Sequence, residues 1–182
     1  EKAVIATGSR AMEIPNFKVD GRRVIGSKEA LELSALPKSM LVIGGGVIGL
    51  EIGTYYAKLG AQVAVAELMP QLMPGIDSEF VAPVARSLEK LGVKVYLNTQ
   101  ALSYEERDCE AAVKLKTSEG EVEIMAAKIL LSVGRRPNTQ NLGLESVGVE
   151  IDPKGFIRVN ERLETTASGI FAIGDVTPGP LL

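Results

Sequence analysis

The chain has 182 residues, of which 46% are apolar and 24% charged, the usual mix for a globular protein. Its net charge of −3 and its lack of a Lys/Arg run exclude a basic nucleic-acid-binding surface, and no apolar run reaches the length of a membrane span. A single cysteine, Cys109, and no histidine exclude an internal disulfide, a Cys/His metal site and a His-dependent catalytic triad. We therefore expect no metal and no catalytic side chain, and any chemistry must come from a cofactor.

The first part of the chain predicts one strand and a long connector. Residues 2–7 form an apolar run that ends in Thr7-Gly8-Ser9, which is typical of a strand entering a turn. Residues 10–37 are mixed and interrupted by Pro and Gly, which indicates a connector with a short helix near residues 28–33. The chain does not begin with Met and has no signal-peptide layout, so we expect it to begin inside a longer protein.

A strand–turn–helix–strand unit follows. Residues 40–43 predict a buried strand, residues 50–59 have helical spacing, and residues 62–66 predict a second apolar strand. Gly60 lies where helices commonly end with a left-handed glycine. Such a unit predicts two neighbouring parallel strands.

The middle of the chain changes its period. Asp77 is expected to cap a helix that runs to about Leu91 and contains Pro83 in its first turns. Shorter runs then predict a third strand, a three-stranded antiparallel meander and a further buried strand. These lie at residues 93–97, at residues 101–106, 111–117 and 122–126, and at residues 128–132.

The last part predicts a polar loop and short strands. Residues 135–139 are polar and contain Pro137, which indicates a loop. Two short strands are expected at residues 149–151 and 156–159, and a third at residues 169–175, ending in Gly-Asp.

Three glycines match the dinucleotide-binding pattern G-x-G-x-x-G. Gly44, Gly46 and Gly49 follow a predicted strand and open a helix, which is the context that gives the pattern its meaning. The first glycine permits a tight turn, the second lets backbone approach a pyrophosphate, and the third lets helix and strand pack closely. The helix start then offers free N–H groups and a partial positive charge to phosphates.

Glu67 ends the second strand of this unit, at the usual distance from the glycines. A carboxylate there accepts the hydroxyls of an adenosine ribose and repels a 2′-phosphate. Residues 68–73 contain no Arg or Lys to bind such a phosphate, so the pattern favours NAD over NADP. The plainer interpretation, a solvated strand end beside an ordinary turn, requires several features to coincide by chance.

Glu51 lies in the first turns of the same helix. Its spacing fits equally well a favourable charge near the positive helix end and a position beside the nicotinamide.

Four motifs in one order resemble the flavin-dependent disulfide oxidoreductases. They are Ala6-Thr7-Gly8-Ser9, residues 44–51, residues 133–139 and residues 170–176. The ending, from Gly174 to Leu182, is most similar to the dihydrolipoyl dehydrogenase branch of that family. The resemblance covers nearly the whole chain.

The resemblance implies two sets of cofactor-binding residues. The NAD set has Glu67 on the adenosine ribose, Ile48 and Glu51 beside the nicotinamide, and Ala101 and Gly134 lining the same site. Its members are Gly44, Gly45, Gly46, Val47, Ile48, Gly49, Leu50, Glu51, Glu67, Ala101 and Gly134. The FAD set, in which Asp175 accepts from ribityl or ribose hydroxyls, comprises Thr7, Gly8, Ser9, Asp175, Leu181 and Leu182. From the residues alone, the plainer interpretations are favoured, which are an ordinary strand-end turn for Thr7 to Ser9 and a helix cap for Asp175.

The resemblance and the predicted elements together give an α/β fold. We expect a Rossmann-like FAD/NAD(P)-binding fold with a parallel sheet, helices on one face and the antiparallel meander on the other. Residues 37–135 are expected to form the NAD-binding domain. Residues 1–36 and 136–182 are expected to be connectors and strips of an FAD domain. Such strips either expose their apolar faces, pair with each other or pair with another copy.

For the longer protein, the resemblance implies transfer of electrons from dihydrolipoamide to NAD⁺ through FAD and a redox disulfide. It implies a homodimer in the cytoplasm, or in the mitochondrial matrix of a eukaryote, whose partner is a lipoyl-bearing acyltransferase or H-protein. Related NAD(P)H reductases, such as mercuric reductase, NADH peroxidase and glutathione reductase, remain alternatives. A stand-alone nucleotide-binding or redox-sensing module is a further one.

The chain departs from the family pattern in what it lacks. It has no first G-x-G-x-x-G for FAD, no C-x-x-x-x-C pair and no interface domain with a His–Glu base. Cys109 lies between Asp108 and Glu110, and acidic neighbours disfavour a reactive thiolate. We therefore expect a passive thiol and a chain that is inactive by itself.

Overall fold

The computed structural model describes residues 1–179, and the chain forms two compact units. One unit consists of residues 13–134, and the other combines residues 1–12 with the segment that begins at Arg135. Residues 13–36, expected as part of a connector, lie in the first unit because they add a strand to its sheet.

The first unit is built on a five-stranded parallel sheet. The strands are β3 (Val24–Ile25), β4 (Ser39–Ile43), β5 (Gln62–Ala66), β6 (Lys94–Tyr96) and β10 (Lys128–Leu131). Their order in the sheet is β3-β10-β4-β5-β6. The chain therefore moves from β4 through β5 to β6 on one side and returns to place β10 on the other side of β4.

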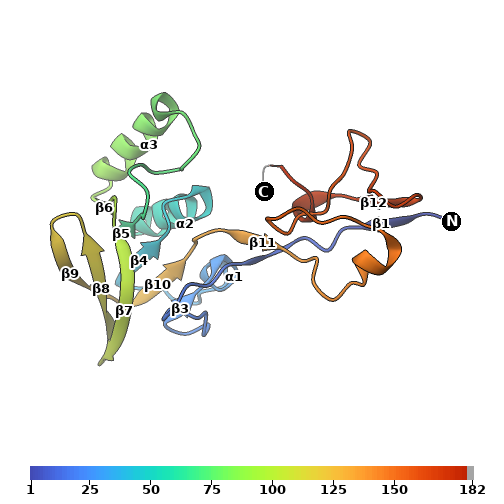
Figure 1. Cartoon of the computed structure of the whole chain (residues 1–182). Coiled ribbons are helices and arrows are strands. Elements are labelled where there is room, and N and C mark those ends of the chain that lie inside the picture. Colours follow the sequence, from blue (N-terminus) through green and yellow to red (C-terminus); the bar gives the residue numbers. More distant parts are fainter. Residues whose placement is uncertain (180–182) are drawn as a thin grey trace. The chain divides into compact units, whose positions relative to one another are not determined.

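Helices cover one face of this sheet and a meander covers the other (Figure 1). The helices are α1 (Ser27–Leu31), α2 (Val47–Lys58) and α3 (Ser78–Lys90). The meander, in the order β7-β8-β9, consists of β7 (Gln100–Arg107), β8 (Glu110–Thr117) and β9 (Gly120–Ala126).

Alternating side chains of β4 supply both cores. Met40 and Val42 pack among the helices, whereas Leu41 and Ile43 pack against the meander, as expected for a strand buried on both faces. The α/β fold class predicted from the sequence is confirmed. No helix within residues 1–179 has the length and apolarity needed to cross a membrane.

The helix ends follow the sequence signals only in part. Gly60 takes the predicted left-handed conformation (φ +103°) after α2. Asp77 occupies the N-cap of α3, but its side chain makes no capping hydrogen bond. The hydroxyl of Tyr56 in α2 donates to the carbonyl oxygen of Ala30, which ties α2 to α1, and burial raises the pKa of this tyrosine.

The second unit joins the two ends of the chain. Strand β1 (Ala3–Ile5) pairs in parallel with β12 (Ile170–Ala172), and β2 (Ser9–Ala11) pairs antiparallel with β11 (Arg135–Pro137). The terminal strips thus pair with each other, although Val4 stays 60% exposed. Two 3₁₀ helices, η1 (Leu144–Val147) and η2 (Gly174–Val176), complete the unit.

Two predictions for this unit need correction. The loop expected at residues 135–139 is wrong over its first three residues, because they form β11 against a strand that lies far earlier in the chain. The strands expected at residues 149–151 and 156–159 are reduced to two isolated bridges, one between Ile151 and Ile157 and one between Val159 and Thr165.

The packing of Gly49 yields a prediction about stability. A Cβ at this position would collide with the carbonyl oxygen of Gly44 and the hydroxyl of Ser132, and would lie 2.9 Å from Cγ1 of Val42. We expect Gly49→Ala to lower the free energy of unfolding by about 1–3 kcal/mol, since overpacking forces neighbours to shift. Thermal unfolding measures this as a drop of roughly 2–4 °C per kcal/mol.

Gly46→Ala is the matched control, because a Cβ there meets nothing within 4 Å and the backbone has an ordinary negative φ of −76°. It should unfold within a few degrees of the wild type. Equal losses from both variants would contradict the division of roles between these glycines.

Candidate dinucleotide-binding site

The glycine-rich turn lies where the strand order of the sheet reverses. It follows β4, while the neighbouring strand β10 ends at Leu131 and leads into residues 132–134. In open α/β sheets, ligands bind in the crevice beyond the carboxyl ends of the strands at such a switch point. The glycine turn, Glu67 after β5 and Gly134 after β10 therefore follow the carboxyl ends of neighbouring strands, at the edge of the sheet that can form such a crevice.

Gly44 and Gly49 allow the turn to pack closely against Ser132. Gly44 has a φ of +103°, and a Cβ on it would lie 2.5 Å from the carbonyl oxygen of Ser132. Gly49, in the first turn of α2, is packed against Gly44 and Ser132. The hydroxyl of Ser132 lies 3.1 Å from the carbonyl oxygen of Ile43 and 3.0 Å from that of Gly44.

Gly46 differs from them because it faces open space. It is the N-cap of α2, and a Cβ built on it meets no atom of residues 1–179 within 4 Å. The first helical hydrogen bond runs from the N–H of Leu50 to the carbonyl oxygen of Gly46. The N–H groups before Leu50 have no acceptor inside the helix, so they can bind an anion that approaches over Gly46.

Glu67 lies directly against the glycine turn. Only 6% of this residue is exposed. One carboxylate oxygen accepts from the backbone N–H of Gly45 at 2.6 Å, and the other accepts from the N–H of Met69 at 2.7 Å. A carboxylate has about four acceptor positions, so two backbone donors leave capacity for sugar hydroxyls.

The short distance between Glu67 and the turn explains why residue 45, which the G-x-G-x-x-G pattern leaves open, is also a glycine. A Cβ on Gly45 would lie 3.2 Å from the Oε2 atom of Glu67 and 2.7 Å from a methyl group of Leu72. The carbonyl oxygen of Gly45 accepts from the N–H of Met73, which ties the loop after β5 to the turn.

The other predicted NAD residues occupy different environments. Val47 and Glu51 are exposed at the start of α2, whereas Leu50 is buried in the helical core. Ala101 lies half-buried in β7, and Gly134 follows β10 with a φ of +125°. The side chain of Leu50 therefore serves packing in the core and is not available to a ligand.

The predicted FAD residues that the structure describes lie in the second unit. The hydroxyl of Thr7 donates to the carbonyl oxygen of Asn138 at 2.7 Å, and the amide of Asn138 donates back to that of Thr7 at 3.0 Å. Ser9 donates to Asp175 at 2.6 Å and accepts from Nε of Arg135 at 2.6 Å. Leu181 and Leu182 lie outside the described residues.

Sequence reasoning assigned no role to Ser132, Arg135 or Asn138. Arg135 and Asn138 lie inside the motif of residues 133–139 that carried the family resemblance, which was the signal available. Ser132 was visible only as the last residue of a predicted strand.

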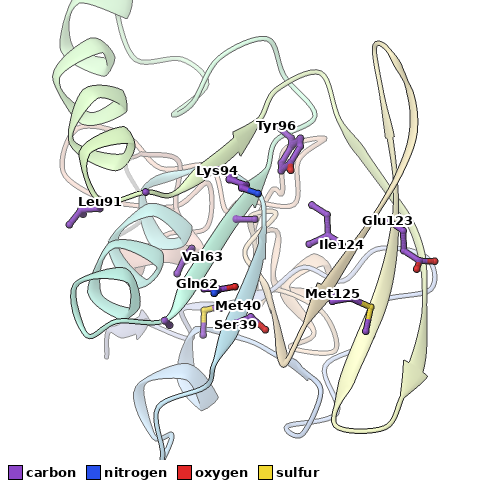
Figure 2. Close-up of a pocket in the computed structure, with 13 residues that line it drawn as sticks. Ser39, Met40, Gln62, Val63, Leu91, Lys94, Tyr96, Glu123, Ile124 and Met125 are labelled. Atoms are coloured by element: carbon purple, nitrogen blue, oxygen red, sulfur yellow. The ribbon is translucent and has the colours of Figure 1, made fainter.

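A separate hollow of about 580 Å³ lies between the central sheet and β9 (Figure 2). None of the residues of the glycine turn lines it. It is lined by Ser39, Met40, Ala61, Gln62, Val63, Ala64, Leu91, Gly92, Lys94, Tyr96, Glu123, Ile124 and Met125.

Two further observations concern the cysteine and the acidic side chains of the described residues. Cys109 is an exposed free thiol in the turn between β7 and β8. Within residues 1–179, the His, Cys, Asp and Glu side chains form no group of three that could hold a metal ion.

Sequence comparisons identify the family and the relatives to which the chain is similar. The family model described as "Pyridine nucleotide-disulphide oxidoreductase" matches residues 1–182. The dihydrolipoyl dehydrogenase of Thermus scotoductus is 46% identical over 98% of the chain, and that of Geobacillus stearothermophilus is 42% identical over 100%. The chain spans only 39% and 38% of the lengths of these two relatives.

Solved structures give the same result. LpdA from Mycobacterium tuberculosis superposes with a TM-score of 0.87 at 30% identity, covering 98% of the chain and 38% of that protein. The HOCl-induced flavoprotein disulfide reductase RclA from Escherichia coli superposes with a TM-score of 0.85 at 29% identity, covering 100% of the chain and 41% of that protein. The chain therefore belongs to the pyridine nucleotide-disulphide oxidoreductase family.

Proposed function

We propose that residues 13–134 bind NAD(H) at the carboxyl edge of the central sheet. The observation that carries the proposal is the contrast among the glycines: Gly44 and Gly49 are closed in by protein atoms, whereas Gly46 is open. A turn that only had to reverse the chain would not need an empty position at the start of a helix. We call the glycine turn and the start of α2 the cradle, because an open position beside free helix N–H groups is what a pyrophosphate requires.

Glu67 fits the adenosine half of the same ligand. Its carboxylate is fixed beside the turn by the N–H groups of Gly45 and Met69. A buried carboxylate accepts from ribose hydroxyls and repels a 2′-phosphate, and no Arg or Lys occurs in residues 68–73 to offset that repulsion. We infer a preference for NAD over NADP.

We infer further that the whole protein is a dihydrolipoyl dehydrogenase, which oxidises dihydrolipoamide to lipoamide while NAD⁺ is reduced to NADH. Its relatives of that name, at 40–46% identity over this segment, support the inference. Bound FAD and a redox disulfide supply the electron relay in such an enzyme. The chain's own contribution is to orient the nicotinamide and, through Asp175, to accept from a flavin hydroxyl. A homodimer that receives electrons from lipoyl-bearing partner proteins follows from the same inference.

Another family member, such as a mercuric or glutathione reductase, is the second candidate for the whole protein. The solved structure of a flavoprotein disulfide reductase, RclA, at 29% identity favours it over an unrelated function.

We expect the purified chain to show no lipoamide-dependent NADH turnover. It has one cysteine, Cys109, so it cannot form the disulfide that exchanges electrons with the substrate. A spectrophotometric assay at 340 nm, with lipoamide and NADH, measures this. Turnover above the rate without protein would contradict the expectation.

Gly46→Ala should lower the affinity for NADH at least about tenfold, equivalent to roughly 1.4 kcal/mol. The added methyl group would stand between the pyrophosphate and the amides of α2, in space that none of the described residues occupies. Isothermal titration of the wild type and the variant measures the change. A variant that unfolds normally and binds NADH with unchanged affinity would rule out the cradle as the binding site.

NADH should stabilise the chain more than NADPH does. At a hundred times its dissociation constant, a ligand adds about 2.7 kcal/mol to the free energy of unfolding, which is a shift of roughly 5–10 °C here. Thermal unfolding in matched concentrations of the two nucleotides makes the comparison. Equal shifts would refute the preference assigned to Glu67, and the absence of any shift would refute binding by this unit alone.

A further inference from the structure

Three side chains from distant parts of the sequence meet in the second unit. They are Ser9 in β2, Arg135 in β11 and Asp175 in η2. Pairing of β2 with β11 brings the first two together, and the residues are partly buried. The side chain of Asp175 is 19% exposed and that of Arg135 is 26% exposed.

The only proton of the Ser9 hydroxyl is used by a protein acceptor. Its single proton is donated to the Oδ2 atom of Asp175 at 2.6 Å, and its oxygen accepts from Nε of Arg135 at 2.6 Å. Arg135 also donates from Nη2 to the backbone oxygen of Ser9 at 2.9 Å. A hydroxyl has only one proton to donate, so Ser9 in this arrangement has none left for a ligand.

Within the part of the chain that the structure describes, one carboxylate oxygen of Asp175 has a donor and the other has none. Oδ2 accepts from Ser9 and lies 3.5 Å from Nε of Arg135, whose positive charge compensates the carboxylate. Within residues 1–179, no side-chain or backbone donor forms a hydrogen bond to Oδ1. Two contacts on one oxygen fix the plane of the carboxylate, which sets the direction of the other.

We propose that Arg135 is a positioning residue for flavin binding that acts through Ser9 and Asp175. It holds the hydroxyl of Ser9 so that this hydroxyl anchors Oδ2, and Oδ1 is then presented to a ribityl or ribose hydroxyl of FAD. Ser9 thus serves Asp175 rather than the cofactor, which changes the role that the family resemblance implied for it. The inference rests on the proposed function, because it assumes that Asp175 contacts FAD.

The neighbouring Arg136 provides a matched control. It lies in the same strand, β11, pairs with Arg10 in the sheet register and is exposed. Within the described residues its guanidinium forms no hydrogen bond or ion pair with another side chain, unlike that of Arg135. Substitution of either arginine by an uncharged residue removes a positive charge from β11. Only substitution of Arg135 also removes the contact with Ser9.

The test is a double-mutant cycle in the full-length protein that contains this chain. Apoprotein is titrated with FAD, and the dissociation constant is read from flavin fluorescence for Arg135→Met, Asp175→Asn, the double variant and Arg136→Met. Thermal unfolding of each apoprotein separates a loss of fold from a loss of binding.

We expect Arg135→Met and Asp175→Asn each to weaken FAD binding about tenfold or more, and the double variant to bind no more weakly than Asp175→Asn alone. Arg136→Met should bind as the wild type does. If the two effects multiply in the double variant, or if Arg135→Met lowers only the unfolding temperature, Arg135 does not act through Asp175 and the inference is wrong. If Asp175→Asn leaves FAD affinity unchanged, the flavin part of the proposed function fails instead.

Discussion

The site depends on how closely three backbone segments approach one another at the carboxyl edge of the sheet. The turn after β4, the end of β10 and the first turn of α2 meet where Gly44 and Gly49 have no Cβ. That contact fixes the start of α2 beside the strand ends. The free N–H groups of the first turn of α2 then point out of the sheet. A helix dipole is useful to an anion only if its N-terminus is rigidly placed and accessible. The packing of Gly44 and Gly49 fixes its position, and the missing side chain at Gly46 leaves it accessible.

Glu67 links the glycine turn to the position expected for the adenosine ribose. Its carboxylate accepts from the N–H of Gly45, so the residue expected to select the sugar also holds the turn expected to bind the diphosphate. The absence of a side chain at Gly45 makes this contact possible, because a Cβ there would crowd both Glu67 and Leu72. The proposed function therefore couples sugar recognition and diphosphate recognition through the contact between Glu67 and Gly45.

The sequence predicted most of the first unit because its signals are local. The apolar runs of β4 and β5, the glycine fingerprint between them and the change of period before the meander each lie within a few residues. The short strands β2, β3 and β11 were missed, since two or three residues carry no periodicity and their pairing depends on distant partners. The contacts of Arg135 with Ser9, which lies 126 positions away, and of Ser9 with Asp175, 166 positions away, were invisible for the same reason.

The most direct measurement is a ¹H–¹⁵N NMR titration of the chain with NAD⁺, observed at backbone amides. If the amides at the start of α2 bind the diphosphate, the largest shifts will occur at residues 46–50, with further shifts at Gly45 and Met69, whose N–H groups contact Glu67. Shifts confined to the separate hollow around Lys94 and Met125, with the glycine turn unchanged, would contradict the account.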